Sequence, residues 1–157
     1  MPNYKDERII SYGHLVAAYS EVYRKVCHSI QEEAGLPSPW FEILLLIAQS
    51  EEGHLKMTEI ADHVLLTTGG ITRLVDRMVE DNLVLRVPCP TDRRIQWVVL
   101  TDHGRAQLDK AIEYHLVDLD NYYLGPFTSS EFIQFNDLIE KLRIFNLDKK
   151  SKNSNPK

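Results

Sequence analysis

The sequence predicts a mainly α-helical protein with one small β-hairpin. Along most of the 157 residues, apolar side chains recur at the spacing of a helix. Two short β-like runs, Leu83–Val87 and Ile95–Leu100, break this pattern, and a loop with two prolines joins them. Two short helical segments precede the hairpin, and longer ones lie toward both ends of the chain. We therefore expect a small helix-and-hairpin core flanked by longer terminal helices.

The first two helices follow from their apolar stripes and their boundary residues. The pattern predicts one long helix over residues 6–33, which the turn around Gly35 ends. Ser38 is the predicted N-cap of the next helix, and Pro39 takes its first position, where a missing amide donor costs nothing. A short strand around Leu55 is expected to pair with the hairpin.

The middle of the chain predicts two short helices with a tight turn between them. Met57–Leu65 forms the first helix, Leu66–Thr68 the turn, and Gly69–Asn82 the second helix. The second helix has an apolar inner stripe made of Ile71, Leu74, Val75 and Met78. Together with the hairpin, this arrangement is a winged helix-turn-helix. In such a domain the second helix can enter a DNA major groove, while the hairpin reaches along the duplex.

After the hairpin the sequence predicts two further helices. Thr101 caps a helix that runs to about Leu124, and Gly125-Pro126 ends it. Thr128 and Glu131 form a capping box for the last helix. The resulting division of the chain is an N-terminal helix over 1–36, a winged helix-turn-helix over 37–101, C-terminal helices over 102–147 and a disordered tail over 148–157.

The start of the helix over 69–82 suits close contact with an anion. Thr67 or Thr68 can cap this helix, and Gly69 and Gly70 place no side chain between the backbone and a partner. Exposed amide groups at a helix start are suited to binding a phosphate.

The outward face of the same helix carries groups that can read bases. Thr72 and Arg73 lie one turn further along, where arginine can hold guanine with two hydrogen bonds and threonine can pack its methyl group on thymine. Arg77 lies on the same face. The alternative is a solvated face on which Arg73 pairs with Asp76 and Arg77 with Glu80.

The hairpin loop is a second basic feature. Pro88 and Pro90 lack amide donors, so they stop the strand and the tip is expected to project from the ladder. Arg93 and Arg94 at such a tip contribute little to folding, but they suit a narrow minor groove with its strong negative potential. Asp92 can hold the Arg94 guanidinium in one orientation before binding. A mobile, solvated turn is the alternative.

The net charge of −5 is unfavourable for binding nucleic acid, so its distribution matters. Residues 1–72 hold 5 basic and 10 acidic groups, whereas residues 73–105 hold 6 arginines and 5 acidic groups. Residues 106–157 hold 7 basic and 8 acidic groups. The acidic groups are therefore concentrated away from the candidate DNA face. The small basic surplus predicts weak non-specific binding and dependence on two copies of the site.

Four segments carry a resemblance to a known family: Thr72–Met78, Asn82–Arg86, Asp92–Arg94 and Leu100–Gly104. In order and spacing they resemble the MarR family of bacterial transcriptional regulators, and the wider likeness covers about residues 8–147. In that family they are the recognition helix, the strand after it, the wing tip and the start of the following helix. Asn82 departs from the usual glycine, although asparagine also tolerates the left-handed conformation.

The resemblance implies a homodimer that binds double-stranded DNA. Helix, wing and resemblance together predict a DNA-binding surface made of Thr67, Thr68, Gly69, Thr72, Arg73, Arg77, Arg86, Asp92, Arg93 and Arg94. The resemblance places Arg77 and Arg86 near phosphates and Arg94 in the minor groove. MarR proteins dimerise through their terminal helices, which sets two recognition helices about one turn apart on a palindromic operator. A compact monomer with those helices folded back is the alternative.

The resemblance also implies a repressor that a small molecule releases from its operator. An aromatic compound is one candidate class, and the pocket in this family lies between the dimer helices and the winged domain. The candidate lining residues are His14, Tyr19, Trp40 and Leu44. An aromatic cluster of this kind is more often part of a core. The sequence does not separate a repressor from an activator.

Other functions find less support in the sequence. No phosphate-binding glycine loop, catalytic serine motif or metalloprotease motif is present, so we expect neither an enzyme nor a cofactor. No two of the six histidines have the spacing of a helical metal site, and no metal is predicted. A winged helix used for protein contacts is the alternative to DNA binding. A redox-responsive regulator is another, using Cys27, expected to pack as a small hydrophobe, or Cys89, expected to be exposed.

Composition also bears on location. The longest apolar run is too short to cross a membrane, and the N-terminus has no apolar signal region. Two cysteines far apart in the chain fit a reducing compartment. We expect a cytoplasmic protein.

Overall fold

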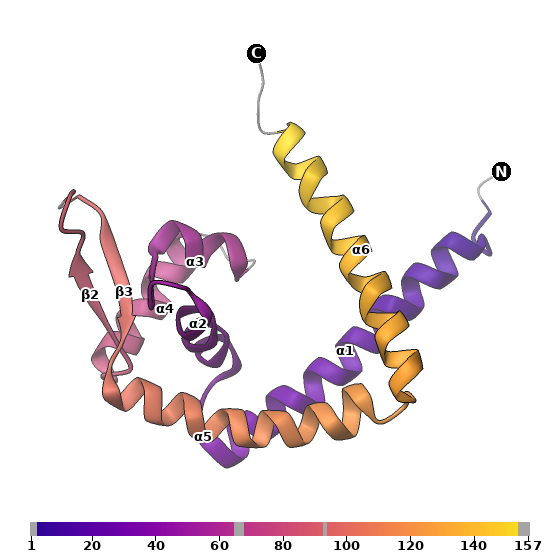
Figure 1. The fold of residues 1–157 in the computed structure, drawn as a ribbon, viewed down its shortest axis with the longest axis horizontal. Coiled ribbons are helices and arrows are strands. Elements are labelled where there is room, and N and C mark those ends of the chain that lie inside the picture. Colours follow the sequence, from indigo (N-terminus) through magenta and orange to yellow (C-terminus); the bar gives the residue numbers. More distant parts are fainter. Residues whose placement is uncertain (1–2, 65–67, 93, 154–157) are drawn as a thin grey trace. The chain divides into compact units, whose positions relative to one another are not determined.

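The computed structural model describes residues 3–64, 68–92 and 94–153, and the chain divides into two compact units, Met1–Asp118 and Leu119–Lys157 (Figure 1). Unit 1 contains helices α1 (Glu7–Ala34), α2 (Ser38–Gln49), α3 (Met57–His63), α4 (Thr68–Glu80) and α5 (Asp102–Asp118), with strands β1 (His54–Lys56), β2 (Val84–Pro88) and β3 (Gln96–Leu100). Unit 2 contains the π-helical segment η1 (Leu119–Leu124) and helix α6 (Ser129–Asn153). The predicted mainly helical fold with a small hairpin is confirmed.

The ends of α1 follow the prediction, whereas the start of α2 does not. The Asp6 carboxylate accepts the Arg8 amide at 2.9 Å and caps α1, and Gly35 ends that helix with a φ of 69°. Ser38 was expected to cap α2, but it is the first residue of this helix, and the cap position is Pro37, which makes no side-chain hydrogen bond. Pro39 is tolerated because amides in a first turn have no intrahelical partner.

The core of unit 1 forms where α1, α2, α3, α4, α5 and the sheet meet. Its fully buried side chains include Ile43, Leu44, Ile47, Ile60, Val84, Val98 and Leu108. The predicted inner stripe of α4 is confirmed, since Ile71, Val75 and Met78 are buried and Leu74 is partly buried. This packing leaves the opposite face of α4 to solvent.

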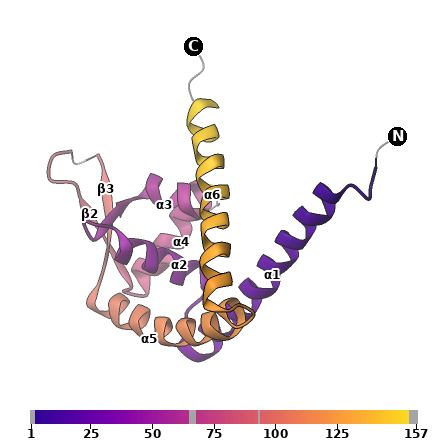
Figure 2. The ribbon, with the colours of Figure 1, turned by 45° about the vertical axis from the view of Figure 1, so that its right-hand side comes forward.

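The sheet is antiparallel, with β1 and β2 both paired to β3 in the order β1-β3-β2. Leu55 lies opposite Val98, and Val84 lies opposite Leu100. The predicted strand near Leu55 is therefore confirmed. From both directions of view, the β2–β3 hairpin extends beyond the helices of unit 1 as a wing (Figure 2).

The wing strands pair further than the prolines suggested. Pro88 was expected to stop the strand, but it is the last residue of β2 and lies opposite Gln96. The Cys89 amide then donates to the Ile95 carbonyl at 2.9 Å. Pro88 is tolerated there because β2 is an edge strand, where the missing amide breaks no continuous ladder.

The turn between α4 and β2 is joined to the start of α5. Asn82 has a φ of 56°, the left-handed conformation for which asparagine substitutes for glycine. The Thr101 amide donates to the Leu83 carbonyl at 3.1 Å, and the Thr101 hydroxyl accepts the Gly104 amide at 2.8 Å, which confirms the predicted cap. A Cβ at Gly104 would lie 1.9 Å from the Leu83 carbonyl oxygen. Only glycine therefore fits at this contact.

Unit 2 begins with an irregular segment and continues as one helix. The Thr128 amide donates to the Glu131 carboxylate at 2.8 Å, and the Glu131 amide donates back to the Thr128 hydroxyl at 3.4 Å, so the predicted capping box is confirmed. Phe127 and Phe135 stack with ring centroids 5.0 Å apart, and Tyr123 meets Phe132 edge-on at 5.7 Å.

The C-terminal part differs from the prediction in two respects. The helix expected to run to about Leu124 is α-helical to Asp118 and π-helical over Leu119–Leu124, because apolar spacing over six residues does not separate π from α geometry. The tail expected to be disordered from residue 148 continues α6 to Asn153, because polar residues without glycine or proline also suit a solvated helix. Residues 154–157 of that tail lie outside the described residues.

Two side chains on α5 each have one buried polar atom without a hydrogen-bond partner among the described residues. His115 packs against Phe41 of α2 with ring centroids 4.9 Å apart, and its Nδ1 atom is buried. Asp118 is only 7% exposed, and its Oδ2 atom is likewise unpartnered within that part of the chain. Burial lowers the pKa of His115, and the nearby Asp118 carboxylate opposes this in part.

We predict that Gly104→Ala lowers the free energy of unfolding by about 1–3 kcal/mol, because the new methyl group must displace the Leu83 backbone. Gly13→Ala is the matched control. No atom lies within 4 Å of a Cβ at this position in α1, so stability should rise by about 0.5–1 kcal/mol. Urea unfolding followed by circular dichroism measures both. Equal effects at the two positions would contradict the packing described.

We predict that His115 makes the protein less stable in mild acid. Its pKa is lower in the folded than in the unfolded chain, so its stabilising contribution is complete above the unfolded value of 6.5 and is lost as pH falls through the folded value. Replacing it by a neutral side chain, His115→Gln, should flatten the fall in unfolding free energy between about pH 7 and pH 5. His103→Gln, on the exposed start of α5, is the control for the substitution itself. If the unfolding free energy falls with pH equally steeply in the wild type and in His115→Gln, His115 does not cause the loss of stability in acid.

Candidate DNA-binding surface

The outward face of α4 presents three of the predicted site residues. Thr72, Arg73 and Arg77 are exposed, while the inner stripe of the helix is buried in the core. Among the described residues, neither arginine makes the ion pair expected on a merely solvated helix face: Arg73 does not pair with Asp76, nor Arg77 with Glu80. Two cationic side chains therefore point away from the protein body.

The start of α4 lies partly outside the described residues. Thr67, a predicted cap, falls in the segment 65–67, which the structure does not describe. Thr68 and Gly69 begin the helix, and Gly70 follows as an exposed residue. The contact predicted between this helix start and a phosphate would therefore be made by backbone amides of Thr68–Gly70.

Arg86 has a partner that the sequence reasoning missed. Its Nη1 atom lies 2.6 Å from Asp76 Oδ1 of α4, and its Nη2 atom donates to the Thr72 carbonyl at 3.4 Å. The side chain is 30% exposed, and Nε is buried with no partner among the described residues. The sequence signal that could have predicted this ion pair was an acidic residue on the helix and a basic residue on the strand that returns along it. Spacing rules within one helix do not detect such a pair.

The wing tip holds the predicted Asp92–Arg94 pair. The Asp92 carboxylate accepts the Arg94 amide at 3.0 Å, Nε at 3.1 Å and Nη2 at 3.1 Å, while the Arg94 side chain is 91% exposed. The side-chain and backbone hydrogen bonds from Arg94 lower the pKa of Asp92, so the carboxylate stays ionised in mild acid. Arg93 lies outside the described residues. The pair gives an exposed guanidinium a fixed orientation.

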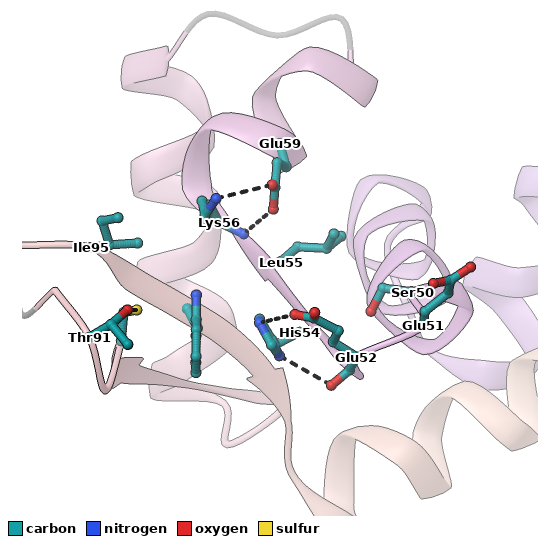
Figure 3. Close-up of a pocket in the computed structure, with 11 residues that line it drawn as sticks. Ser50, Glu51, Glu52, His54, Leu55, Lys56, Glu59, Thr91 and Ile95 are labelled. Carbon is teal, nitrogen blue, oxygen red and sulfur yellow. Dashed lines mark hydrogen bonds and ion pairs between the residues drawn. The ribbon is translucent and has the colours of Figure 1, made fainter.

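A hollow of about 550 Å³ lies between the outer part of the wing and the segment around β1 (Figure 3). It is lined by Ser50, Glu51, Glu52, His54, Leu55, Lys56, Glu59, Cys89, Thr91, Ile95 and Trp97. The His54 ring stacks on Trp97 at 3.9 Å and pairs with Glu52 at 3.0 Å. Lys56 reaches Glu59 at 3.6 Å, so much of the charge around this hollow is already paired.

Cys89 was expected to be exposed, and this prediction is wrong. The residue is only 6% exposed, and its Sγ atom lies 3.2 Å from the Thr91 hydroxyl oxygen. The reason is the extended pairing of the wing, which holds the Cys89 backbone against Ile95 and turns its side chain into the hollow. The hydrogen bond with Thr91 lowers the pKa of the Cys89 thiol. Cys27 is half-buried on α1.

The four candidate effector residues lie in different surroundings. Leu44 is fully buried in the core, whereas His14 is exposed and Tyr19 stacks on Tyr23 with ring centroids 5.4 Å apart. Trp40 lines a second hollow of about 280 Å³, together with Leu36, Asp81, Leu83, His103 and Gln107. Neither this hollow nor the one beside the outer part of the wing gathers all four side chains.

Within the described ranges, no group of three or more His, Cys, Asp or Glu side chains could hold a metal ion. In the same part of the chain, no helix is both long and apolar enough to cross a membrane.

Comparison with known proteins gives one consistent family. Residues 34–95 match the model of the MarR family. The transcriptional regulator MhqR of Bacillus subtilis is 28% identical over 109 residues, which cover 68% of this chain and 74% of MhqR. The repressor MdtR of the same organism is 24% identical over 128 residues, covering 82% of this chain and 80% of MdtR.

Among solved structures, the MarR-family regulator Sco3205 of Streptomyces coelicolor, crystallised in complex with DNA, has the same fold. Its TM-score is 0.79 at 22% sequence identity, and the match covers 91% of this chain and 90% of Sco3205.

Proposed function

We propose that the chain is a member of the MarR family of DNA-binding transcription regulators, which it resembles in sequence and fold, and that it is a repressor that binds a palindromic operator as a homodimer. In this proposal α4 of each copy enters the major groove, with Thr72 and Arg73 at base edges and Arg77 at the backbone. Arg94 enters the adjoining minor groove. DNA is the partner, so we place the protein's action in the cytoplasm.

The geometry of the wing tip is the observation that carries this proposal. Arg94 is almost fully exposed, yet both oxygens of Asp92 hold it in one orientation. An exposed ion pair of this kind contributes little to stability. It does reduce the conformational entropy that an arginine loses when it enters a groove. The exposed arginines of α4 belong to the same unit as the wing, so both features can contact one duplex.

Apolar side chains on the terminal helices support the proposed homodimer. Exposed large apolar residues on α1 include Ile9, Ile10, Tyr12, Leu15, Val16, Tyr19 and Tyr23, and those on α6 include Ile133, Leu138, Leu142, Ile144, Phe145 and Leu147. Large apolar side chains exposed in such number on one helix favour an interaction site. A second copy is the fitting occupant, because a two-fold pair presents two recognition helices to a palindrome.

We also propose that a small molecule releases the repressor. Its ligand would bind more tightly to a spacing of the two copies that does not fit the operator. An aromatic ligand is one candidate class, and residues His14, Tyr19, Trp40 and Leu44 are the candidate lining. Because Leu44 is a core residue and Tyr19 is exposed, a pocket with all four would have to form with the partner copy or on ligand binding.

We predict that Arg94→Ala weakens operator binding about tenfold or more without unfolding the protein, because a minor-groove contact is lost. The assay is a salt titration of binding to a duplex selected by the wild-type protein from a randomised pool. Arg8→Ala is the matched control, since Arg8 is equally exposed and is held by Asp6 in the same way, but on α1. If Arg94→Ala binds like Arg8→Ala, the wing assignment is wrong.

Arg73→Ala should act differently from Arg94→Ala at the same DNA. A base contact is expected to relax sequence preference, so binding to the selected duplex should fall more than binding to unrelated duplexes. Uniform weakening across all sequences would instead assign Arg73 to a phosphate.

We predict that Leu142→Asp converts the dimer to a monomer and weakens operator binding, because a charge would be buried between copies. Leu85→Asp is the matched control on the wing: Leu85 is 47% exposed and Leu142 48%. Sedimentation equilibrium gives the mass of each variant. A wild-type protein that sediments as a single chain would refute the homodimer.

A further inference from the structure

The ion pair between Asp76 and Arg86 joins the middle of the recognition helix to the middle of the wing's edge strand. Arg86 Nη1 lies 2.6 Å from Asp76 Oδ1, and Nη2 reaches the Thr72 carbonyl one helical turn earlier at 3.4 Å. Both helix residues lie beside Arg73 and Arg77 on the outward side of α4. The pair is therefore part of the surface that the proposed function turns toward DNA.

Arg86 is poorly placed to grip a phosphate, which is the role the family resemblance implies. A two-pronged contact with phosphate uses two adjacent N–H donors of the guanidinium. Nη1 is held by Asp76, Nη2 donates to the Thr72 carbonyl, and Nε is buried without a partner among the described residues, so neither adjacent pair of donors is free. To bind a phosphate with two donors, Arg86 would have to leave Asp76.

Asp76 is itself unfavourable on a DNA-facing surface. A carboxylate close to the phosphates opposes the charge neutralisation that drives non-specific binding. Asp76 nevertheless has a structural role. The turn at residues 81–83 connects α4 to β2 at one end, and the Asp76–Arg86 pair adds a second fixed point nearer the middle of the helix. Two fixed points define the angle between a helix and a strand, whereas one permits rotation.

We infer that Asp76 and Arg86 form a clamp that sets the angle of α4 against the wing, so that both are positioning residues for operator recognition. The inference rests on the proposed DNA-binding function. It assigns Asp76 a role in recognition and moves Arg86 from phosphate contact to positioning. Recognition depends on such a clamp because base-reading groups must be held within about 0.5 Å of their working position.

The clamp predicts an unusual response to removing a negative charge. Asp76→Asn should weaken binding to the selected duplex about tenfold, while binding to unrelated duplexes stays level or rises because a repulsive charge is gone. Arg86→Gln should lose about as much specific affinity as Asp76→Asn, and the double variant no more than either, because each change opens the same clamp. Arg86→Lys, which keeps a charge near Asp76, should lie between wild type and Arg86→Gln.

The salt dependence of binding separates positioning from phosphate contact. A lost phosphate contact lowers the slope of log affinity against log salt by about 0.9, whereas a lost clamp leaves the slope unchanged. Asp81→Asn is the matched control: it removes the same charge just beyond the end of α4, at an exposed residue outside the clamp, and should not lower specific affinity. Thermal unfolding confirms that each variant is folded, and a purely structural role would lower the melting temperature without changing the ratio of specific to non-specific binding.

Two outcomes overturn the inference. If Asp76→Asn tightens binding to the selected duplex while Arg86→Gln reduces the salt slope, Arg86 contacts a phosphate and Asp76 is only a repulsive neighbour. If the double variant loses as much as the two single variants together, the residues act independently. In each of these two outcomes the wild-type protein still binds DNA, and the proposed function stands. A wild-type protein that binds no duplex at low salt would instead overturn the proposed function and the clamp together.

Discussion

The contact between the α4–β2 turn and the start of α5 is the constraint on which the candidate DNA-binding surface depends. The left-handed Asn82 turns the chain, the Leu83 carbonyl accepts the Thr101 amide, and Gly104 lies too close to that carbonyl for any side chain. The recognition helix, both wing strands and α5 thus share one attachment. A fixed distance between helix and wing is what simultaneous contact with two grooves requires.

Sequence alone predicted the features that depend on a few neighbouring residues. The buried stripe of α4, the Thr101 cap, the capping box at Thr128 and the Asp92–Arg94 contact all follow from short-range spacing. The features it missed depend on chain segments brought together by folding. Arg86 meets Asp76 only after β2 returns along α4, and Cys89 is buried in a wing whose backbone it joins by the hydrogen bond from its amide to the Ile95 carbonyl. Which residues face DNA is a property of a complex and stays a prediction.

The charge of the interface is better suited to specificity than to strong attraction. The chain carries a net charge of −5, and two of the arginines near the candidate surface, Arg86 and Arg94, are each paired with an aspartate. Each pairing reduces the field that draws in a duplex, but it also fixes where the cation lies. Because exposed pairs contribute little to folding, their benefit lies in orientation. In the proposed homodimer, affinity then comes from two copies engaging together, which would make the apolar terminal helices as important to recognition as α4.

The same attachment limits how a ligand can release such a dimer. Helix α5 starts at the turn and packs along α1 and α2, with Ile30, Leu108 and Ala111 buried between them. Closely packed interiors of this kind switch between discrete arrangements and do not bend continuously. Tilting α4 within one copy would break the Gly104 contact and the core beneath it. Changing the spacing of two intact copies in the proposed dimer would break neither contact. If an effector binds between the copies, we therefore expect each winged domain to move as one body.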